Sequence, residues 1–244
     1  MPLRRQTDMP LLNPLLAVLA AYLIGSLSFA IIVSHAFRLK DPRTYGSGNP
    51  GATNVLRSGN KGAAGITLLL DALKGCVPVL LVQGFGESFG LGQGTAAAVA
   101  LAAFLGHLWP VFFKVHGGKG VATAAGAIFG LNPWLGLATL ATWLIVAAFF
   151  RYSSLAAIVS AVFAPFYQLL IWGGGAPAIA ISVMGLLLIW RHSANIQKLL
   201  KGTESKLGQK KSASLPAAHG HHPGAPGHAH PPTAKHAHKE GKKR

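Results

Sequence analysis

The sequence predicts an all-α membrane protein with seven transmembrane helices, its amino terminus outside and its carboxyl terminus in the cytoplasm. Hydrophobic residues make up 51% of the chain and charged residues only 11%, with a mean hydropathy of +0.42, which excludes an ordinary soluble fold. Apolar runs recur along the chain, several of them near the ~20 residues needed to cross a bilayer. Lys and Arg gather in alternate loops, which is the pattern of cytoplasmic loops.

Seven apolar segments are the expected spans. They cover residues 11–32, 62–82, 94–113, 120–131, 134–150, 154–172 and 177–190. The fourth is short and could instead be a re-entrant segment. If it did not cross, Arg151 and the basic carboxyl tail would lie outside, against the charge rule. Extended to 117–134, it reaches the length that a thin bilayer region requires.

The loops support this orientation. Basic side chains follow the first, third, fifth and seventh segments: Arg38, Lys40, Arg43, Arg57, Lys61, Lys114, Lys119, Arg151, Arg191, Lys198 and Lys201. Loops 83–93, 132–133 and 173–176 contain no Lys or Arg. Arg4 and Arg5 are the exception. They precede an apolar run as in a signal peptide, but the run is long and lacks a small-residue cleavage pattern, so we expect a retained first span.

Two domains are expected: a membrane domain, 1–202, and a disordered, basic, His-rich cytoplasmic tail, 203–244. The tail has eight Lys or Arg against two Glu, so it supplies +6 of the net charge of +16, and no nucleic-acid partner is implied. Its seven histidines are irregularly spaced, which favours an appendage near anionic lipid over metal binding. Cys76 is the only cysteine, which excludes an intramolecular disulfide and a cysteine metal cluster. We expect neither a metal nor a cofactor.

The loop 46–57, Gly-Ser-Gly-Asn-Pro-Gly-Ala-Thr-Asn-Val-Leu-Arg, is the first candidate site. Its glycines allow sharp turns, and its polar side chains are donors suited to phosphate oxygens: Ser47, Asn49, Thr53, Asn54 and Arg57. The simpler alternative is a glycine-rich connector whose Arg57 anchors to lipid headgroups. The density of donors favours an anion site at the membrane surface.

The second candidate runs from Gly106-His107 through Gly117-Gly-Lys-Gly to Thr123 and leads into the fourth segment. A helix amino terminus favours anions, and Lys119 adds a full positive charge, so the segment resembles a phosphate-binding loop. It lacks the Walker A spacing, so no ATP is implied. A lone histidine such as His107 is more often a packed side chain than a catalyst.

The third candidate comprises the segment 151–154 and the segment 191–195. Snorkelling anchorage explains Arg151 but not His192 and Asn195, which are three residues apart and share a helix face. Within the second span, Asp71 and Lys74 lie at i and i+3. We expect a structural ion pair there rather than a catalytic one.

Four motifs together resemble the bacterial acyl-phosphate:glycerol-3-phosphate acyltransferases, the PlsY family. They are GSGNPGATNVLR, GHLWPVFFKVHGGKGVAT, RYSSLAAI and RHSANIQKLLKGTE, and the likeness spans about residues 15–208. It implies a seven-helix, multi-pass protein of the bacterial inner membrane, with a periplasmic amino terminus and an active site on the cytoplasmic face. It further implies acyl transfer from acyl phosphate to the 1-hydroxyl of sn-glycerol 3-phosphate, which forms lysophosphatidic acid and phosphate for phospholipid synthesis.

The resemblance also implies the site residues and partners. The expected substrate-binding residues are Ser47, Thr53, Asn54, Arg57, Lys119, Ser154, His192 and Asn195. His192, Lys119 and Arg57 are the expected catalytic residues. The expected partners are the two substrates, membrane lipids and, as a functional partner, the enzyme that produces acyl phosphate.

An acyl phosphate is already activated, so catalysis can rest on orientation and on stabilising the oxyanion and the departing phosphate. We expect direct attack by the substrate hydroxyl. Its proton would pass to His192, to the candidate base His107 or to a substrate phosphate. A transporter of phosphate or organophosphate anions remains the alternative, although its site would lie near the membrane midplane. A structural scaffold would not need repeated phosphate-type loops.

Overall fold

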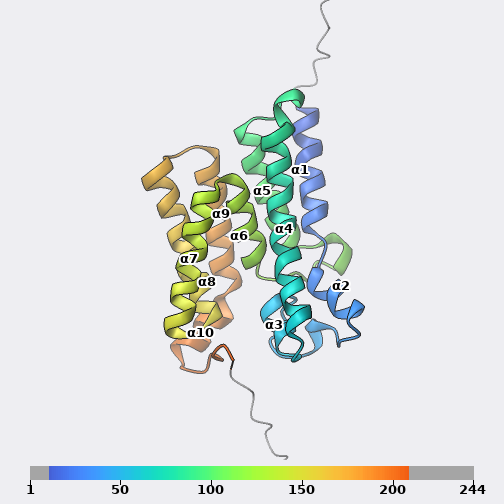
Figure 1. Ribbon diagram of the computed structural model, residues 1–244, viewed down its shortest axis with the longest axis vertical. Coiled ribbons are helices and arrows are strands. Elements are labelled where there is room, and N and C mark those ends of the chain that lie inside the picture. The colour runs from blue at the N-terminus through green and yellow to red at the C-terminus, as the bar shows by residue number, and fades with distance from the viewer. Residues whose placement is uncertain (1–10, 209–244) are drawn as a thin grey trace, which may run out of the picture. The chain divides into compact units, whose positions relative to one another are not determined.

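The computed structural model describes residues 11–208, and all the regular secondary structure in that range is helical (Figure 1). The α-helices are α1 Leu12–Gly25, α2 Phe29–Ala36, α3 Ala52–Leu56, α4 Lys61–Phe85, α5 Gln93–Leu108, α6 Val121–Leu131, α7 Pro133–Phe150, α8 Ser153–Tyr167, α9 Ala176–Arg191 and α10 Ser193–Leu200. Short 3₁₀ turns cover Pro42–Thr44, Gly86–Phe89 and Val111–Phe113, and a π-helical turn covers Gln168–Trp172. The expected all-α fold is confirmed.

Four helical segments in the described range are long and apolar enough to cross a membrane. The number rises to six if α1 with α2 and α9 with α10 each form one bent span, with bends of 43° and 57°. The apolar α6 is shorter, with 11 residues.

Small residues allow the helices to approach closely. A Cβ on Gly126 of α6 would come within 1.9 Å of the Ala72 carbonyl oxygen in α4, and one on Gly75 of α4 within 2.2 Å of the Thr123 carbonyl oxygen. Such backbone contacts are typical of helix pairs in membranes, where large side chains gain little by leaving lipid. Large side chains such as Leu15 and Phe149 are accordingly exposed on the outside of the bundle.

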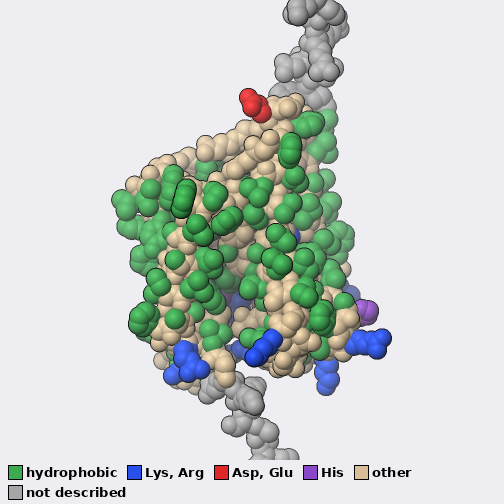
Figure 2. Space-filling model, viewed as in Figure 1, with side chains coloured by type: hydrophobic (Ala, Val, Ile, Leu, Met, Phe, Trp, Pro, Cys, Tyr) green, Lys and Arg blue, Asp and Glu red, His purple; other side chains and the backbone are tan. Residues whose placement is uncertain are grey.

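Charge is distributed unevenly over the bundle. Figure 2 shows a broad surface of hydrophobic side chains, with Lys and Arg side chains gathered below it, at the end where Figure 1 shows α2, α3 and α10. This arrangement matches a helical bundle that meets the polar region of a bilayer at its basic end.

Two sequence-based boundaries were wrong. The first apolar segment is not one helix, because α1 ends at Gly25 and α2 begins at Phe29 after a break. The fourth segment does not extend to 117–134. Residues 117–120 form a loop ending with Gly120 at φ 82°, and the Asn132 side chain caps α7 by accepting hydrogen bonds from the Trp134 and Leu135 amides.

Candidate functional site

The loop before α3 is organised around Asn54, a side chain with only 1% exposure. Its Nδ2 donates to the carbonyl oxygens of Pro42, at 2.6 Å, and Tyr45, at 3.1 Å. Its Oδ1 accepts from the Ser47 amide at 3.0 Å and from Arg57 Nη1 at 3.4 Å. Because these bonds occupy the amide group from all sides, Asn54 positions Ser47 and Arg57 and has no group left for a ligand.

Glycine is required beside this amide. Gly46 has φ 62°, and a Cβ there would come within 2.2 Å of Asn54 Oδ1. The loop therefore turns back over its own buried amide, which explains why a glycine begins the motif.

The Lys119 loop is packed between His107 and Arg191. A Cβ on Gly118 would lie 2.2 Å from His107 Nε2 and 2.9 Å from the Pro50 carbonyl oxygen, so glycine brings the two candidate loops together. Arg191 Nη2 donates to the carbonyl oxygens of Gly117, at 2.9 Å, and Gly118, at 3.1 Å. These contacts hold the backbone that carries Lys119.

His107 connects this loop to the buried ion pair of α4. Its Nδ1 lies 3.2 Å from Thr123 Oγ1 and 3.7 Å from Asp71 Oδ1, and Asp71 pairs with Lys74 at 2.7 Å. Lys74 also donates to the Leu27 carbonyl oxygen at 2.6 Å. His107 therefore lies behind the Lys119 loop, where it supports the backbone at Gly118.

A carboxylate joins the carboxyl-terminal part of the site. Lys119 Nζ donates to Asn195 Oδ1, and Asn195 Nδ2 donates to Glu204 Oε1 at 2.7 Å. Ser154, a buried residue, donates to the same Glu204 oxygen at 2.8 Å. Next to Glu204, Ser205 Oγ accepts from Arg57 Nη2 at 3.0 Å. The segment 203–207 therefore connects the opening loop to α8 and α10, and the folded part reaches beyond residue 202.

The two titratable residues at the helix ends have lowered pKa values. Burial is the main cause for Lys119, whose pKa falls to about 8; the neighbouring cations Arg57, Lys198 and Arg191 add to the effect, and Glu204 opposes it. Burial and the charge of Lys119 lower the pKa of His192 to about 4. The His192 Nδ1 lies 2.8 Å from the Leu188 carbonyl oxygen, so the neutral ring donates from Nδ1 and keeps an Nε2 lone pair.

A pocket of about 450 Å³ opens beside Lys119. Its lining is polar and basic and comes from the opening loop, the Lys119 loop and the end of α9: Arg43, Ser47, Gly48, Asn49, Pro50, Val115, His116, Gly117, Lys119 and Arg191. The charge and the hydrogen-bond donors of this lining suit an anion such as phosphate.

The structure thus brings most of the predicted site residues together. Lys119, Asn195, Ser154 and Arg57 are linked directly or through the segment 203–207, and Thr53 Oγ1 lies 3.5 Å from Ser153 Oγ at the start of α8. Ser47 lies across the pocket on the same lining as Lys119. His107 is outside this lining.

Three residues in or beside the pocket were not singled out from the sequence. Glu204 fell in the expected tail, Arg191 belonged to the third candidate segment but was given no role of its own, and Arg43 precedes the glycine motif. An isolated acid among basic residues, within the motif RHSANIQKLLKGTE, was the one signal for Glu204.

Fold and site together define a multi-pass membrane protein with a pocket, partly lined by basic and polar side chains, at the basic end of its helical bundle. Residues 15–202 match the family model described as glycerol-3-phosphate acyltransferase. The chain belongs to this family.

Curated relatives named glycerol-3-phosphate acyltransferase align over nearly their full length. The protein from Ralstonia pickettii (strain 12J) is 62% identical over 205 residues, covering 84% of this chain and 99% of the relative. The protein from Ralstonia nicotianae is 66% identical over 192 residues, covering 79% and 93%.

Two crystal structures of PlsY, an integral membrane glycerol 3-phosphate acyltransferase, have the same fold. The glycerol 3-phosphate form has a TM-score of 0.74 and 38% sequence identity, covering 80% of this chain and 96% of that chain. The lysophosphatidic acid form has a TM-score of 0.73 and 37% identity, covering 80% and 95%.

Proposed function

We propose that this chain transfers a fatty acyl group from acyl phosphate to the 1-hydroxyl of glycerol 3-phosphate, forming lysophosphatidic acid and phosphate. Acyl transfer to glycerol 3-phosphate follows from the family, whose solved relative has forms named for glycerol 3-phosphate and lysophosphatidic acid. The convergence of Lys119, Asn195, Ser154 and Arg57 at one end of the bundle is the observation that carries the assignment.

We assign the substrate contacts to side chains that can exchange a hydrogen bond within the protein for one to the substrate. Lys119, Arg57 and Ser47 would bind phosphate oxygens, and Asn195, Ser154 and Thr53 would complete the binding site. Glu204 accepts hydrogen bonds from Asn195 and Ser154, and its carboxylate orients these donors beside Lys119 and Arg57. Asn54 and His107 act through their neighbours, because the first has its amide fully occupied and the second lies behind Gly118.

The reaction needs no covalent enzyme intermediate. The substrate hydroxyl oxygen attacks the carbonyl carbon of acyl phosphate, the bond from that carbon to the phosphate oxygen breaks, and phosphate leaves with the electron pair. Lys119 and Arg57 stabilise the charge on the departing phosphate. The hydroxyl proton passes to His192 Nε2 or to the phosphate.

The low pKa of His192 does not exclude it as the base. Its pKa of about 4 reflects burial and nearby cations, chiefly Lys119. Two bound phosphate groups would offset those cations and stabilise the imidazolium form, raising this pKa toward the range in which a base is effective. The other candidate base, His107, is less well placed because its Nε2 faces Gly118.

The membrane orientation belongs to the same proposal. We infer seven crossings, with α6 as the short fourth span, a periplasmic amino terminus, and the site on the cytoplasmic face of the bacterial inner membrane. The basic end of the bundle and the Lys- and Arg-free loop around Gly86–Phe89 support this orientation. Acyl phosphate and membrane lipids would then be partners within the bilayer, with an acyl-phosphate-producing enzyme supplying the donor.

The family assignment does not favour the transporter alternative, and the donors lie at one end of the bundle rather than at its midplane. The test uses purified full-length chain in lipid with acyl phosphate and glycerol 3-phosphate. We expect lysophosphatidic acid and phosphate in equal amounts, and no product when acyl-CoA replaces acyl phosphate. Phosphate flux across sealed vesicles without product would overturn the proposal.

A further inference from the structure

Arg43 lines the pocket although it lies outside the glycine motif. It belongs to the 3₁₀ turn Pro42–Thr44 and shares the lining with Ser47, Lys119 and Arg191. Its side chain is about one-third exposed, at 34%. It is therefore a cation at the pocket wall that solvent and a ligand can both reach.

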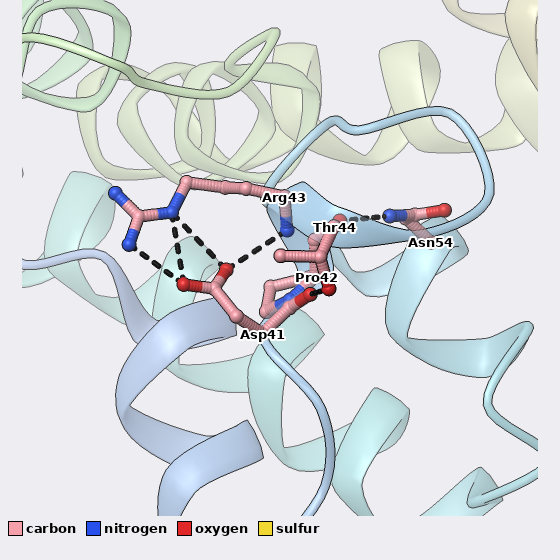
Figure 3. Close-up of polar contacts among 5 residues, drawn as sticks. All are labelled: Asp41, Pro42, Arg43, Thr44 and Asn54. Carbon is pink, nitrogen blue, oxygen red and sulfur yellow. Dashed lines mark hydrogen bonds and ion pairs between the residues drawn. The ribbon is translucent and has the colours of Figure 1, made fainter.

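Asp41 holds the guanidinium of Arg43 in one orientation (Figure 3). Arg43 Nη2 donates to Asp41 Oδ2 at 2.7 Å, and Nε lies 3.1 Å from each carboxylate oxygen. The Arg43 amide also donates to Asp41 Oδ1 at 2.9 Å. The paired guanidinium lowers the pKa of Asp41, so the carboxylate stays ionised at neutral pH.

One terminal nitrogen of Arg43 is left over. Nη1 makes no hydrogen bond within residues 11–208, and in Figure 3 no dashed line reaches the second terminal nitrogen. A guanidinium carries five N–H donors, and the contacts with Asp41 use the Nε and Nη2 side of the fork. The Nη1 donors remain for an acceptor that enters the pocket.

The turn that carries Arg43 is fixed to the opening loop. Thr44 Oγ1 donates to the Asp41 carbonyl oxygen at 2.8 Å, and Asn54 Nδ2 donates to the Pro42 carbonyl oxygen at 2.6 Å. The same Asn54 holds the Ser47 amide. Arg43 and Ser47 are thus positioned by one buried side chain, which keeps their separation constant when a ligand binds.

The proposed reaction brings more negative charge to the pocket than Lys119 and Arg57 together offset. Two substrates bring two phosphate groups, each with a charge of about −1.5 to −2 near neutral pH. Among the basic residues at the pocket, Arg191 uses Nε and Nη2 to bind the carbonyl oxygens of Gly117 and Gly118. Lys119, Arg57 and the Nη1 group of Arg191 are then left to bind two phosphate groups.

We propose that Arg43 is a further ligand for a substrate phosphate, that its Nη1 donors make the contact, and that Asp41 is the residue that positions it. The inference rests on the proposed function and deepens it. Asp41 offsets part of the positive charge of Arg43. Arg43 therefore contributes to phosphate binding mainly through hydrogen bonds of fixed direction. A guanidinium already held by a carboxylate loses little rotamer entropy when it binds.

The experiment compares four variants of the purified full-length protein in steady-state assays in which each substrate is varied separately. Arg43→Gln removes the positive charge and the guanidinium fork, and Arg43→Lys keeps the charge but not the planar fork. Asp41→Asn loosens the orientation. Lys40→Gln is the control because it removes one exposed positive charge three residues away, outside the pocket lining.

We expect Arg43→Gln to raise KM for one of the two phosphate substrates roughly tenfold or more, as for the loss of a charge-assisted hydrogen bond. The substrate whose KM rises is the one that Arg43 binds. Arg43→Lys should stay impaired, since an ammonium cannot reproduce the fork. Asp41→Asn should raise the same KM by a smaller factor while kcat stays within about twofold, and Lys40→Gln should leave both KM values within about twofold.

The inference is overturned if both KM values of Arg43→Gln stay within about twofold of the wild type, or if Lys40→Gln produces the same change. If Arg43→Gln does not remain monodisperse in detergent, the KM values of Arg43→Lys and Asp41→Asn are used instead. The inference is then overturned if both variants keep both KM values within about twofold of the wild type. Failure of the wild-type protein to use acyl phosphate would instead refute the proposed function, so the two outcomes are separate.

Discussion

Lys119 shows how burial tunes a single residue in this site. Its ammonium group is more costly to charge than a surface lysine, and Asn195 rather than a carboxylate is its direct partner. With a pKa of about 8, it is charged at neutral pH and loses that charge at only mildly alkaline pH. Phosphate binding should therefore depend on pH within a range that an assay can cover.

We predict that kcat/KM for glycerol 3-phosphate falls as pH rises through about 8, because the protonated form of Lys119 binds phosphate and the free enzyme loses that proton there. Lys119→Arg should lack this alkaline limb, since a guanidinium remains charged, even if its activity at pH 7 is lower. The measurement is a pH profile from about pH 7 to 9.5, where glycerol 3-phosphate is already dianionic. An unchanged limb in Lys119→Arg would assign the titration to another group.

The convergence of candidate residues could be predicted from the sequence where they belonged to dense polar motifs in an otherwise apolar chain, while their roles stay predictions. Lys119, Arg57, Ser154 and Asn195 are such cases, and the structure joins them. Glu204 could not be recognised in this way, because its partners lie 50 and 9 residues earlier in the chain and only folding brings them to one carboxylate oxygen.

At the scale of elements, the two glycine loops meet where Gly118 passes between His107 and Pro50. No larger residue fits, since a Cβ would overlap the imidazole and crowd a backbone carbonyl. The close approach explains why the loop before α6 is glycine-rich independently of any ligand.

We predict that Gly118→Ala lowers kcat/KM roughly 100-fold, because a shift of about 1 Å in the loop that carries Lys119 misaligns the phosphate. Gly65→Ala in α4 is the matched control, since a Cβ there meets nothing within 4 Å. It should retain activity. Activity assays on both variants, with thermal stability in detergent, make the comparison, and equal activity would contradict the role assigned to this close approach.

The segment 203–207 acts as a strap across the site. It provides Glu204 to Asn195 and Ser154, Ser205 to Arg57, and the Leu207 amide to the Arg151 carbonyl oxygen, at 2.6 Å. Its contacts link the opening loop, α8 and α10.

We predict that a chain ending after Gly208 keeps most of its activity, whereas a chain ending after Gly202 loses at least roughly tenfold in kcat/KM because the contacts that position Asn195, Ser154 and Arg57 are lost. Glu204→Gln in the full-length chain should fall between the two, because it keeps an acceptor oxygen but not the charge. Full activity in the shorter chain would show that the strap is dispensable.

Element boundaries were harder to predict than element types. Gly25, Ser26 and Ser28 interrupt the first apolar run, but hydropathy averaged over the whole run hides so short a polar stretch, and the bend after Gly25 was not predicted. Likewise, the expected extension of the fourth span assumed that residues 117–120 are helical. Arg191 and His107 instead hold them as a loop, through contacts that a hydropathy profile cannot contain.

For the whole molecule, the all-α fold and the position of the site at the basic end could be predicted from hydropathy and the spacing of Lys and Arg. The packing of the helices against one another could not be predicted, because it depends on which small residues face each other. Gly126, for example, faces Ala72. The number of crossings depends on whether the bent helix pairs and α6 each span the membrane.

We predict that labelling will separate the two ends of the bundle. In a Cys76→Ser background, Ser88→Cys in the turn Gly86–Phe89 should react with an impermeant thiol reagent added outside the cytoplasmic membrane, and Lys201→Cys should react only after the membrane is opened. Both positions are exposed. The reverse pattern would invert the proposed topology.

The shortness of α6 has a consequence for how a water-soluble and a lipid-soluble reactant meet. Eleven residues at 1.5 Å each extend about 16 Å, roughly half the hydrocarbon thickness of a bilayer. Because the Lys119 loop lies at the basic end of the bundle, a crossing by α6 requires a locally thinned bilayer. Under the proposed function, the fatty chain can then stay in the hydrocarbon while its phosphate end meets glycerol 3-phosphate at the Lys119 loop.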